Sequence, residues 1–281
     1  MRNNPERLGA SLENQDISPV PVLQEATGDF SFIEANDIVE LPSKGVHYPE
    51  GHILRANPAI ELKPMTAKQE DILVNQAYIK QGTVVDRLLE SIVVDKNLNL
   101  DDLLVGDKNA LLIQARVSAY GKEYPVSSFC RHCYEKQEIT YDLEECVIYK
   151  EATYEDGIES NEDGTFTIQM PKSKLSVTLR FLTSADEKVL AAKKKKYEKY
   201  DMEFSDQLEG FRQMIVAVNG DDKLISKYLD HMPLQDSKYL KKIIKAVPPN
   251  AQMIGNFECK SCDMENEVEV PVTFRFFWPD I

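Results

Sequence analysis

Two pairs of closely spaced cysteines constrain this chain more than any other feature. Cys130 and Cys133 form one Cys-x-x-Cys pair, and Cys259 and Cys262 form the other. Each pair offers two thiolates from one tight turn, and two such turns supply the tetrahedral four-sulfur set that Zn²⁺ prefers. The spacing therefore predicts one structural zinc ion in a closed site, with no coordination position left for a catalytic water.

The surroundings of the cysteines favour metal binding over disulfides. Residues 1–20 are polar and of mixed charge, without the apolar stretch of a secretory signal, so we expect a reducing compartment. Unmetallated buried thiols and iron or redox chemistry are the alternatives to zinc. His132 is expected at an exposed turn tip, although it stays open as a replacement ligand, and Cys146 is expected to be an ordinary core or surface thiol.

The residue after each pair departs from the usual pattern of a cysteine turn. Glycine is common there because the backbone often adopts a left-handed conformation. This chain has Tyr134 and Asp263 at the two positions. Aspartate tolerates positive φ better than tyrosine does, so the first turn carries the weaker match to a zinc knuckle.

An internal repeat explains why residues 134–258 separate the two cysteine pairs. Residues 60–73 align without gaps on residues 177–190, and four positions are identical. The identical pairs are Leu62/Leu179, Thr66/Thr183, Glu70/Glu187 and Leu73/Leu190. Each copy predicts a strand and then a helix capped by threonine, with a downstream glutamate completing the cap. Both copies continue with helices, a proline-containing turn, a cysteine pair and an alternating strand.

The sequence therefore predicts an α+β protein of two similar strand, helices and Cys-knuckle units that share one structural zinc. The expected segments are an extended polar N-terminal arm at 1–36, an extended Leu-Pro-Ser-Lys-Gly segment at 37–58, a first repeat half with the first Cys knuckle at 59–150, an acidic linker or hairpin at 151–164, and a second repeat half with the second Cys knuckle at 165–281. The Asp-Gly step at 163–164 is expected to close a hairpin between strands at 146–149 and 165–170. The arm cannot bury enough surface to fold alone, so we expect either a free tail or a segment that docks on neighbouring subunits.

Several classes of function are disfavoured by the sequence. The 33 Lys+Arg against 47 Asp+Glu leave a net charge of −14, which repels nucleic acids and anionic lipid surfaces. The densest apolar runs are far shorter than the about 20 residues that span a bilayer. We expect no enzyme, because the sequence lacks the hydrolase, metalloprotease and dinucleotide motifs. The lysine run at 193–196 is expected to wrap around a solvated helix, with a basic nucleic-acid patch as the alternative.

The C-terminal residues 272–281 are rich in aromatic side chains. A strand filling the core beside the second knuckle is the expected structure, and an exposed aromatic anchor for a partner is the alternative. Phe276, Phe277 and Trp278 are too closely spaced for all three side chains of a strand to face inward.

The order of several motifs resembles the baseplate hub proteins of T-even-like contractile-tailed bacteriophages. The motifs are residues 41–49, residues 60–73, the two cysteine pairs and residues 274–278. The resemblance covers about residues 38–281 and implies a virion protein of the tail baseplate, assembled in the host cytoplasm, with other baseplate and hub proteins as partners. It implies no catalytic residues and does not indicate whether members of the family bind a metal, so the zinc prediction rests on cysteine spacing alone.

Two other functions stay open from the sequence. A transient baseplate assembly factor would leave before the particle is complete, whereas a structural subunit would remain in the virion. A zinc-ribbon adaptor would bind nucleic acid through a local basic face. Whether the chain forms homo-oligomers also stays open, and a hydrolase or redox enzyme is the weakest alternative.

Overall fold

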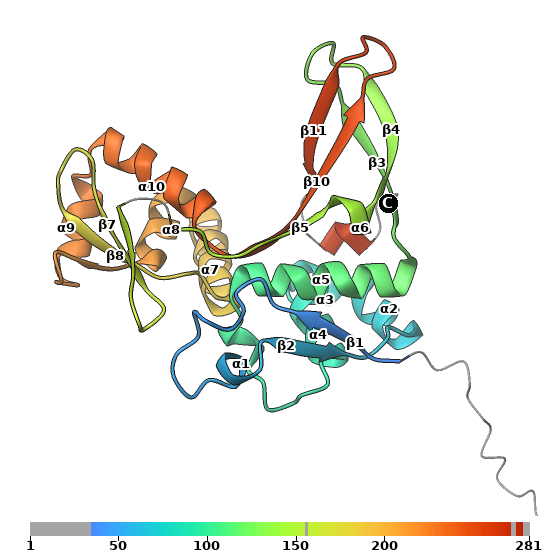
Figure 1. Cartoon of the computed structure of the whole chain (residues 1–281), viewed down its shortest axis with the longest axis horizontal. Coiled ribbons are helices and arrows are strands. Elements are labelled where there is room, and N and C mark those ends of the chain that lie inside the picture. Colours follow the sequence, from blue (N-terminus) through green and yellow to red (C-terminus); the bar gives the residue numbers. More distant parts are fainter. Residues whose placement is uncertain (1–34, 155–156, 271–273, 278–281) are drawn as a thin grey trace, which may run out of the picture. The chain divides into compact units, whose positions relative to one another are not determined.

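The chain combines groups of helices with antiparallel strands (Figure 1). The computed structural model describes residues 35–154, 157–270 and 274–277. The predicted N-terminal arm at 1–36 lies outside these residues except for its last two positions. Strands within the described ranges form sheets of two, three, two and four strands, and every pair is antiparallel. The predicted mixed α+β class is confirmed.

The first part of the chain places a strand pair beside a group of helices. β1 (Asp37–Glu40) pairs with β2 (Ala59–Leu62). The helices are α1 (Ile53–Ala56), α2 (Ala67–Leu73), α3 (Gln76–Gln81), α4 (Val84–Ile92), the 3₁₀ helix η2 (Leu100–Asp102) and α5 (Val105–Tyr120). Val84, Leu88 and Ile92 recur at helical spacing, so α4 buries one apolar face.

Two hairpins carry the cysteine turns. β3 (Glu123–Phe129) pairs with β4 (Lys136–Asp142), and the chain then forms α6 (Leu143–Cys146) and β5 (Val147–Lys150). The second hairpin joins β10 (Asn250–Glu258) to β11 (Glu265–Val270), and β5 extends it by pairing with β10. A strand from the first half of the chain therefore completes a sheet of the second half.

The second half has its own four-stranded sheet and helices. The strands, in sheet order, are β6 (Ile158–Ser160), β7 (Phe166–Gln169), β8 (Ser176–Leu179) and β9 (Ile215–Val218). The helices are α7 (Ser184–Lys199), α8 (Asp206–Met214), α9 (Leu224–Asp230), α10 (Leu234–Ala246) and the 3₁₀ helix η3 (Phe274–Phe277). Within the described residues, no helix is both long and apolar enough to cross a membrane.

The hairpin predicted around residues 163–164 is partly wrong. The turn is present. The N–H of Asn161 donates to the carbonyl of Thr165 at 2.9 Å, and the N–H of Gly164 donates to the carbonyl of Asn161 at 3.2 Å. The register of the β6–β7 pair places Ser160 opposite Phe166. The first strand of that hairpin is β6, whereas the segment near 146–149 pairs with β10 instead. The Asp-Gly step identified the turn correctly, but turn residues do not specify which upstream strand returns to it.

Leu208, Phe211, Ile215 and Val218 recur at a spacing that predicts one helix, but the helix is shorter than this pattern. α8 ends at Met214, and the next four residues form β9, which pairs with β8. Ile215 and Val218 are both buried. β-branched residues favour strands, and this preference explains why the helix stops before the Ile-Val-Ala-Val segment.

The two repeated segments have matching caps. Thr66 begins α2 and Thr183 begins α7, and each threonine takes part in a capping box. The reciprocal partners are Gln69 and Asp186. Each partner lies one position before the glutamate that the sequence predicted, so the cap was expected correctly and its second member was not.

Two buried aspartates, each in the first turn of a helix, bind the segments that follow β1 and β7. Asp107 of α5 accepts hydrogen bonds from the N–H of Ser43 at 3.0 Å and from its hydroxyl at 2.6 Å. Asp236 of α10 accepts from the N–H groups of Lys172 at 2.7 Å and Ser173 at 3.1 Å. Both carboxylates are completely buried. Two turns in corresponding places are therefore fixed by the same type of interaction.

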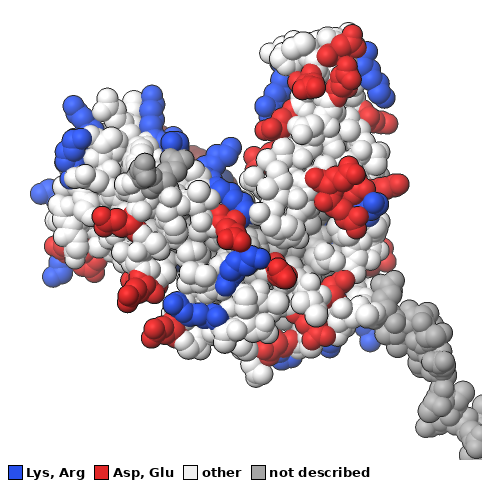
Figure 2. Space-filling view, in the orientation of Figure 1, with Lys and Arg blue, Asp and Glu red and all other residues white. Residues whose placement is uncertain are grey.

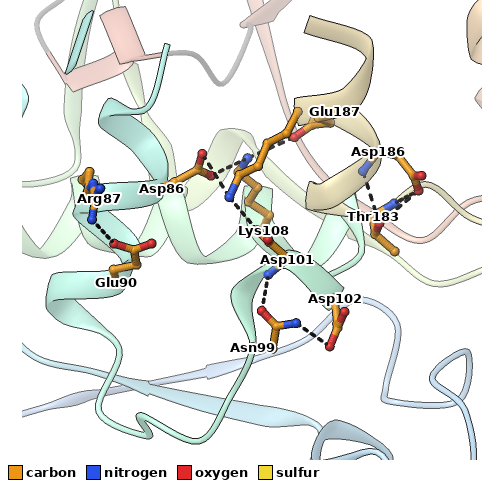
Figure 3. Close-up of polar contacts among 11 residues, drawn as sticks. Asp86, Arg87, Glu90, Asn99, Asp101, Asp102, Lys108, Thr183, Asp186 and Glu187 are labelled. Carbon is orange, nitrogen blue, oxygen red and sulfur yellow. Dashed lines mark hydrogen bonds and ion pairs between the residues drawn. The ribbon is translucent and has the colours of Figure 1, made fainter. Parts of the chain in front are cut away.

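Charged side chains join α7 to α4, α5 and η2 (Figure 3). Lys108 Nζ lies 3.0 Å from a carboxylate oxygen of Glu187 and 3.5 Å from one of Asp86. Lys188 contacts Asp86 and Asp101. Lys108 and Asp86 are largely buried, so this network is less screened by solvent than a surface ion pair. It connects elements of both halves through groups other than the cysteines.

The apolar core draws on both halves and on the C-terminal residues. Its largest fully buried side chains are Tyr48, Phe166, Phe276, Phe277, Leu41, Leu62, Leu73, Leu88, Leu89, Ile92, Leu103 and Leu111. The ring of Phe276 packs 5.1 Å from that of Tyr124. The predicted core location is confirmed for Phe276 and Phe277, but they lie in η3 and not in a strand. Trp278 lies outside the described residues.

Candidate metal centre

The turns of the two hairpins bring all four predicted cysteines together. Their sulfur atoms lie within 4.8 Å of one another, with 3.7 Å between Cys130 and Cys262 and 3.5 Å between Cys133 and Cys259. A disulfide would need about 2.05 Å, so the sulfurs are not bonded in pairs. A tetrahedron with metal–sulfur bonds of about 2.3 Å has sulfur atoms about 3.8 Å apart. The cluster therefore has the size of a tetrathiolate metal site.

Both turns have the same backbone geometry. The N–H of Tyr134 donates to the carbonyl of Cys130 at 3.0 Å, and the N–H of Asp263 donates to that of Cys259 at 2.8 Å. Tyr134 has φ of 61° and Asp263 has φ of 54°. The left-handed position expected after each pair is therefore present, although the first turn places a bulky side chain where the conformation is unfavourable.

Side-chain amides connect each hairpin to the opposite cysteine turn. Gln137 of β4 donates through Nε2 to the sulfur of Cys259 at 2.8 Å, and its Oε1 accepts from the N–H of the next residue at 3.2 Å. Asn266 of β11 donates through Nδ2 to the sulfur of Cys130 at 3.4 Å, and its Oδ1 accepts from the N–H after that cysteine at 2.8 Å. Both amides are buried. Each therefore supports a thiol that the other half supplies.

Neither amide was predicted from the sequence. A sequence pattern was present, because Gln137 and Asn266 both lie four positions after the second cysteine of their pair. The identical residues lie one position later, at Glu138 and Glu267. Glutamine and asparagine are different residue types, so an alignment of identities passes over them although they carry the same donor and acceptor.

The hydrogen bonds distribute charge unequally over the sulfurs. Burial raises the pKa of the Cys130 thiol, but backbone N–H groups of its turn and the Asn266 amide outweigh burial and lower that pKa to about 6. Burial also raises the pKa of the Cys259 thiol, but backbone N–H groups of its turn and the neighbouring thiols of Cys262 and Cys133 outweigh burial and lower that pKa. Burial and the neighbouring cysteines raise the pKa of Cys262 to about 12. Four thiolates this close repel one another, so the full set is stable only with a compensating cation.

The remaining candidates from the sequence lie outside the cluster. His132 is exposed and Cys146 is buried, and neither belongs to the group of four cysteines. Lysines 193–196 lie on α7 and contact different neighbours. Lys193 pairs with Glu209 and Lys194 with Asp206, both of α8, whereas Lys195 donates to the carbonyl of Gln81 in α3 at 2.7 Å. These contacts support the prediction that the lysine run is distributed around a helix.

Comparison with known families decides where this fold belongs. A family model described as T4 bacteriophage base plate protein matches residues 36–278, which include both hairpins and all four cysteines. The chain belongs to this family. No curated protein and no solved structure gives a match. The resemblance predicted from the sequence is confirmed for a phage baseplate protein, and the assignment to the hub stays a prediction.

Proposed function

We propose that this baseplate-family protein is a structural component of the phage tail baseplate hub and acts in baseplate and tail assembly. Membership of the T4 bacteriophage base plate protein family over residues 36–278 carries the proposal. The partners are other baseplate and hub proteins, and the segment before residue 37 docks on them. The role needs no catalysis, and the net charge of −14 favours protein partners over nucleic acid. The protein resides in the virion.

Mass spectrometry of purified infectious particles tests this function. A structural subunit remains in the particle, so its peptides should persist through gradient purification at a fixed ratio to those of other baseplate proteins. A transient assembly factor, the alternative role, would be present in infected cells and in partial baseplates but missing from the particles. That second result would contradict a structural role.

We further propose that Cys130, Cys133, Cys259 and Cys262 bind one structural Zn²⁺. The sulfur separations match the edges of a tetrathiolate site, and the set is complete without a water ligand. Bound zinc would neutralise thiolate charge and link residues of both hairpins. The amides of Gln137 and Asn266 provide the outer hydrogen bonds that metal-bound thiolates commonly receive.

Replacing one ligand tests the metal assignment. We expect Cys130→Ser to lose stoichiometric zinc and to unfold at a lower temperature, because a metal at about 1,000 times its Kd stabilises the folded state by about 4 kcal/mol. Cys146→Ser is the matched control, since Cys146 is buried but outside the cluster. Elemental analysis and thermal unfolding measure both variants. Unchanged zinc content in Cys130→Ser would refute the assignment.

We propose as well that the two halves, at 59–150 and 165–281, derive from a duplication of one unit. Matching features support it: threonine-capped helices after β2 and β8, buried aspartates in α5 and α10, and cysteine turns linked by reciprocal amides. An experimental structure tests the idea by superposition. A single rotation should align these features together, and separate rotations for the cap and for the knuckle would contradict a duplicated unit.

A further inference from the structure

We propose that the four cysteines work as two unequal pairs. Cys130 and Cys259 form a protected pair, locked by the amides of Gln137 and Asn266 from the opposite hairpin. Cys133 and Cys262 form the reactive pair, through which metal is exchanged and electrophiles attack first. This proposal rests on the proposed zinc site and adds that its four ligands differ in reactivity.

Exposure separates the two pairs. Cys130 and Cys259 have no exposed surface, whereas Cys133 is exposed and Cys262 is partly exposed. Each pair takes one cysteine from each turn, so the division is not between one hairpin and the other. With zinc bound all four sulfurs are thiolates, so the pKa values of the metal-free thiols do not decide which sulfur reacts first. A chelator or an electrophile must approach a sulfur atom directly, and only the second pair offers that approach.

The buried amides separate the pairs in the same way. Gln137 donates to Cys259 at 2.8 Å and Asn266 to Cys130 at 3.4 Å. No amide side chain among the described residues makes such a bond to Cys133 or Cys262. Hydrogen bonds to a thiolate draw electron density from its lone pairs and lower its nucleophilicity. Burial and hydrogen bonding therefore protect the same two sulfurs.

The amides also make departure of a protected thiolate more disruptive. Each amide makes two hydrogen bonds to a turn of the other half. Its N–H donates to the sulfur, and its oxygen accepts from the backbone N–H of the next residue. Release of Cys130 or Cys259 from the metal would break the hydrogen bond from its amide, whereas Cys133 and Cys262 can leave the metal without breaking such a bond. Ligand exchange should therefore start at the exposed pair.

Site-resolved alkylation of the full zinc-loaded chain tests the division. With limiting N-ethylmaleimide and peptide mapping, we expect Cys133 and Cys262 to be labelled first, about tenfold or more ahead of Cys130 and Cys259. Zinc release, followed with a chromophoric chelator, should keep pace with labelling of the first pair. Equal labelling of a protected and an exposed cysteine in the wild-type chain would overturn the proposal.

Variants of the amides give a readout that simple loosening of a hairpin would not. Gln137→Met keeps the side-chain volume and should speed labelling of Cys259, in the other half, while Asn266→Ala should speed labelling of Cys130. Thr140→Ala and Asn256→Ala, with exposed side chains on the same hairpins, are the controls and should match wild type. Faster labelling confined to the variant's own hairpin, or none in either amide variant, would overturn the amide lock.

Measuring zinc content before labelling keeps the two proposals apart. A wild-type chain without stoichiometric zinc overturns the metal assignment and, with it, metal exchange through Cys133 and Cys262. A zinc-loaded chain with no order in its labelling overturns only the division into pairs. If Gln137→Met does not fold, Asn266→Ala alone tests the amides. Each variant is expected to speed labelling of the cysteine that its amide contacts in the other hairpin, so either variant can test the proposal.

Discussion

Gly106 is the position where a single methyl group should test how tightly the two halves pack. It lies in the first turn of α5, and a Cβ atom there would meet the carbonyl oxygen of Pro249 at 2.0 Å and the Cα of Asn250 at 2.7 Å. Both obstacles are backbone atoms at the start of β10, so no side chain can rotate away. Gly106→Ala must therefore displace α5 from the second half of the chain.

Gly210→Ala supplies a matched control for the size of this effect. Gly210 also lies in a helix, α8, but a Cβ there meets nothing within 4 Å. Alanine should gain helix propensity of up to about 1 kcal/mol at either site. Overpacking costs about 1 to 3 kcal/mol and applies only to Gly106. The difference between the variants isolates that cost, because the chemical change is the same.

Urea and thermal unfolding measure the two variants side by side. We expect Gly210→Ala to equal or exceed wild type in stability, and Gly106→Ala to be about 1 to 3 kcal/mol less stable than Gly210→Ala. At about 2 to 4 °C per kcal/mol for a chain of this size, the melting temperatures should differ by several degrees. Equal stability of the two variants would refute close packing of α5 on β10.

Two further predictions concern the second half and the C-terminal core. Burial raises the pKa of Asp186, but two 2.7 Å hydrogen bonds from Arg180 and the bonds from Thr183 outweigh burial and lower that pKa. The ionised carboxylate therefore stabilises the fold above the unfolded pKa of about 4, and this stabilisation is lost as pH falls below about 4. Asp186→Asn should cost about 1 to 2 kcal/mol at pH 7 in urea unfolding and progressively less below pH 4, and a penalty independent of pH would contradict the ion pair. Phe276→Ala should lower the free energy of unfolding by about 3 to 5 kcal/mol, because the ring is buried. Phe129→Ala is the control, since that side chain is 60% exposed, and should change the free energy of unfolding by no more than about 0.5 kcal/mol. Similar losses of stability in thermal unfolding of the two variants would show that η3 does not pack as described.

The cysteine cluster was predictable because metal ligation leaves a local pattern. Two Cys-x-x-Cys turns are short-range features with few structural solutions, so their spacing predicted which residues meet although residues 134–258 intervene. The threonine caps at Thr66 and Thr183 were predictable for the same reason. In each case the chemistry is confined to a few neighbouring positions.

Features that depend on tertiary pairing were not predictable in this way. The partner of β5 is β10, far along the chain, and nothing local at residues 147–150 distinguishes that partner from a nearby strand. The roles of Gln137 and Asn266 depend on which sulfur lies opposite after folding, so a polar residue in an alternating strand gave no indication of its partner. The buried Asp107 and Asp236 were missed because their donors come from distant turns.

The composition of the hairpin ends explains why a metal is suited to this place. β3 and β4 form a sheet of only two strands, and such a pair is marginally stable by itself. Around the cysteines the buried side chains include Ser128, Gln137 and Asn266, which are polar and contribute little hydrophobic stabilisation. Phe257 is the nearest buried aromatic residue before Cys259, and at the other end of the first hairpin Tyr124 meets Phe276. A cation bound by all four thiolates would stabilise the turns, as apolar packing stabilises the opposite end of the hairpins. Because each hairpin provides two of the ligands, this stabilisation would require both halves to be folded.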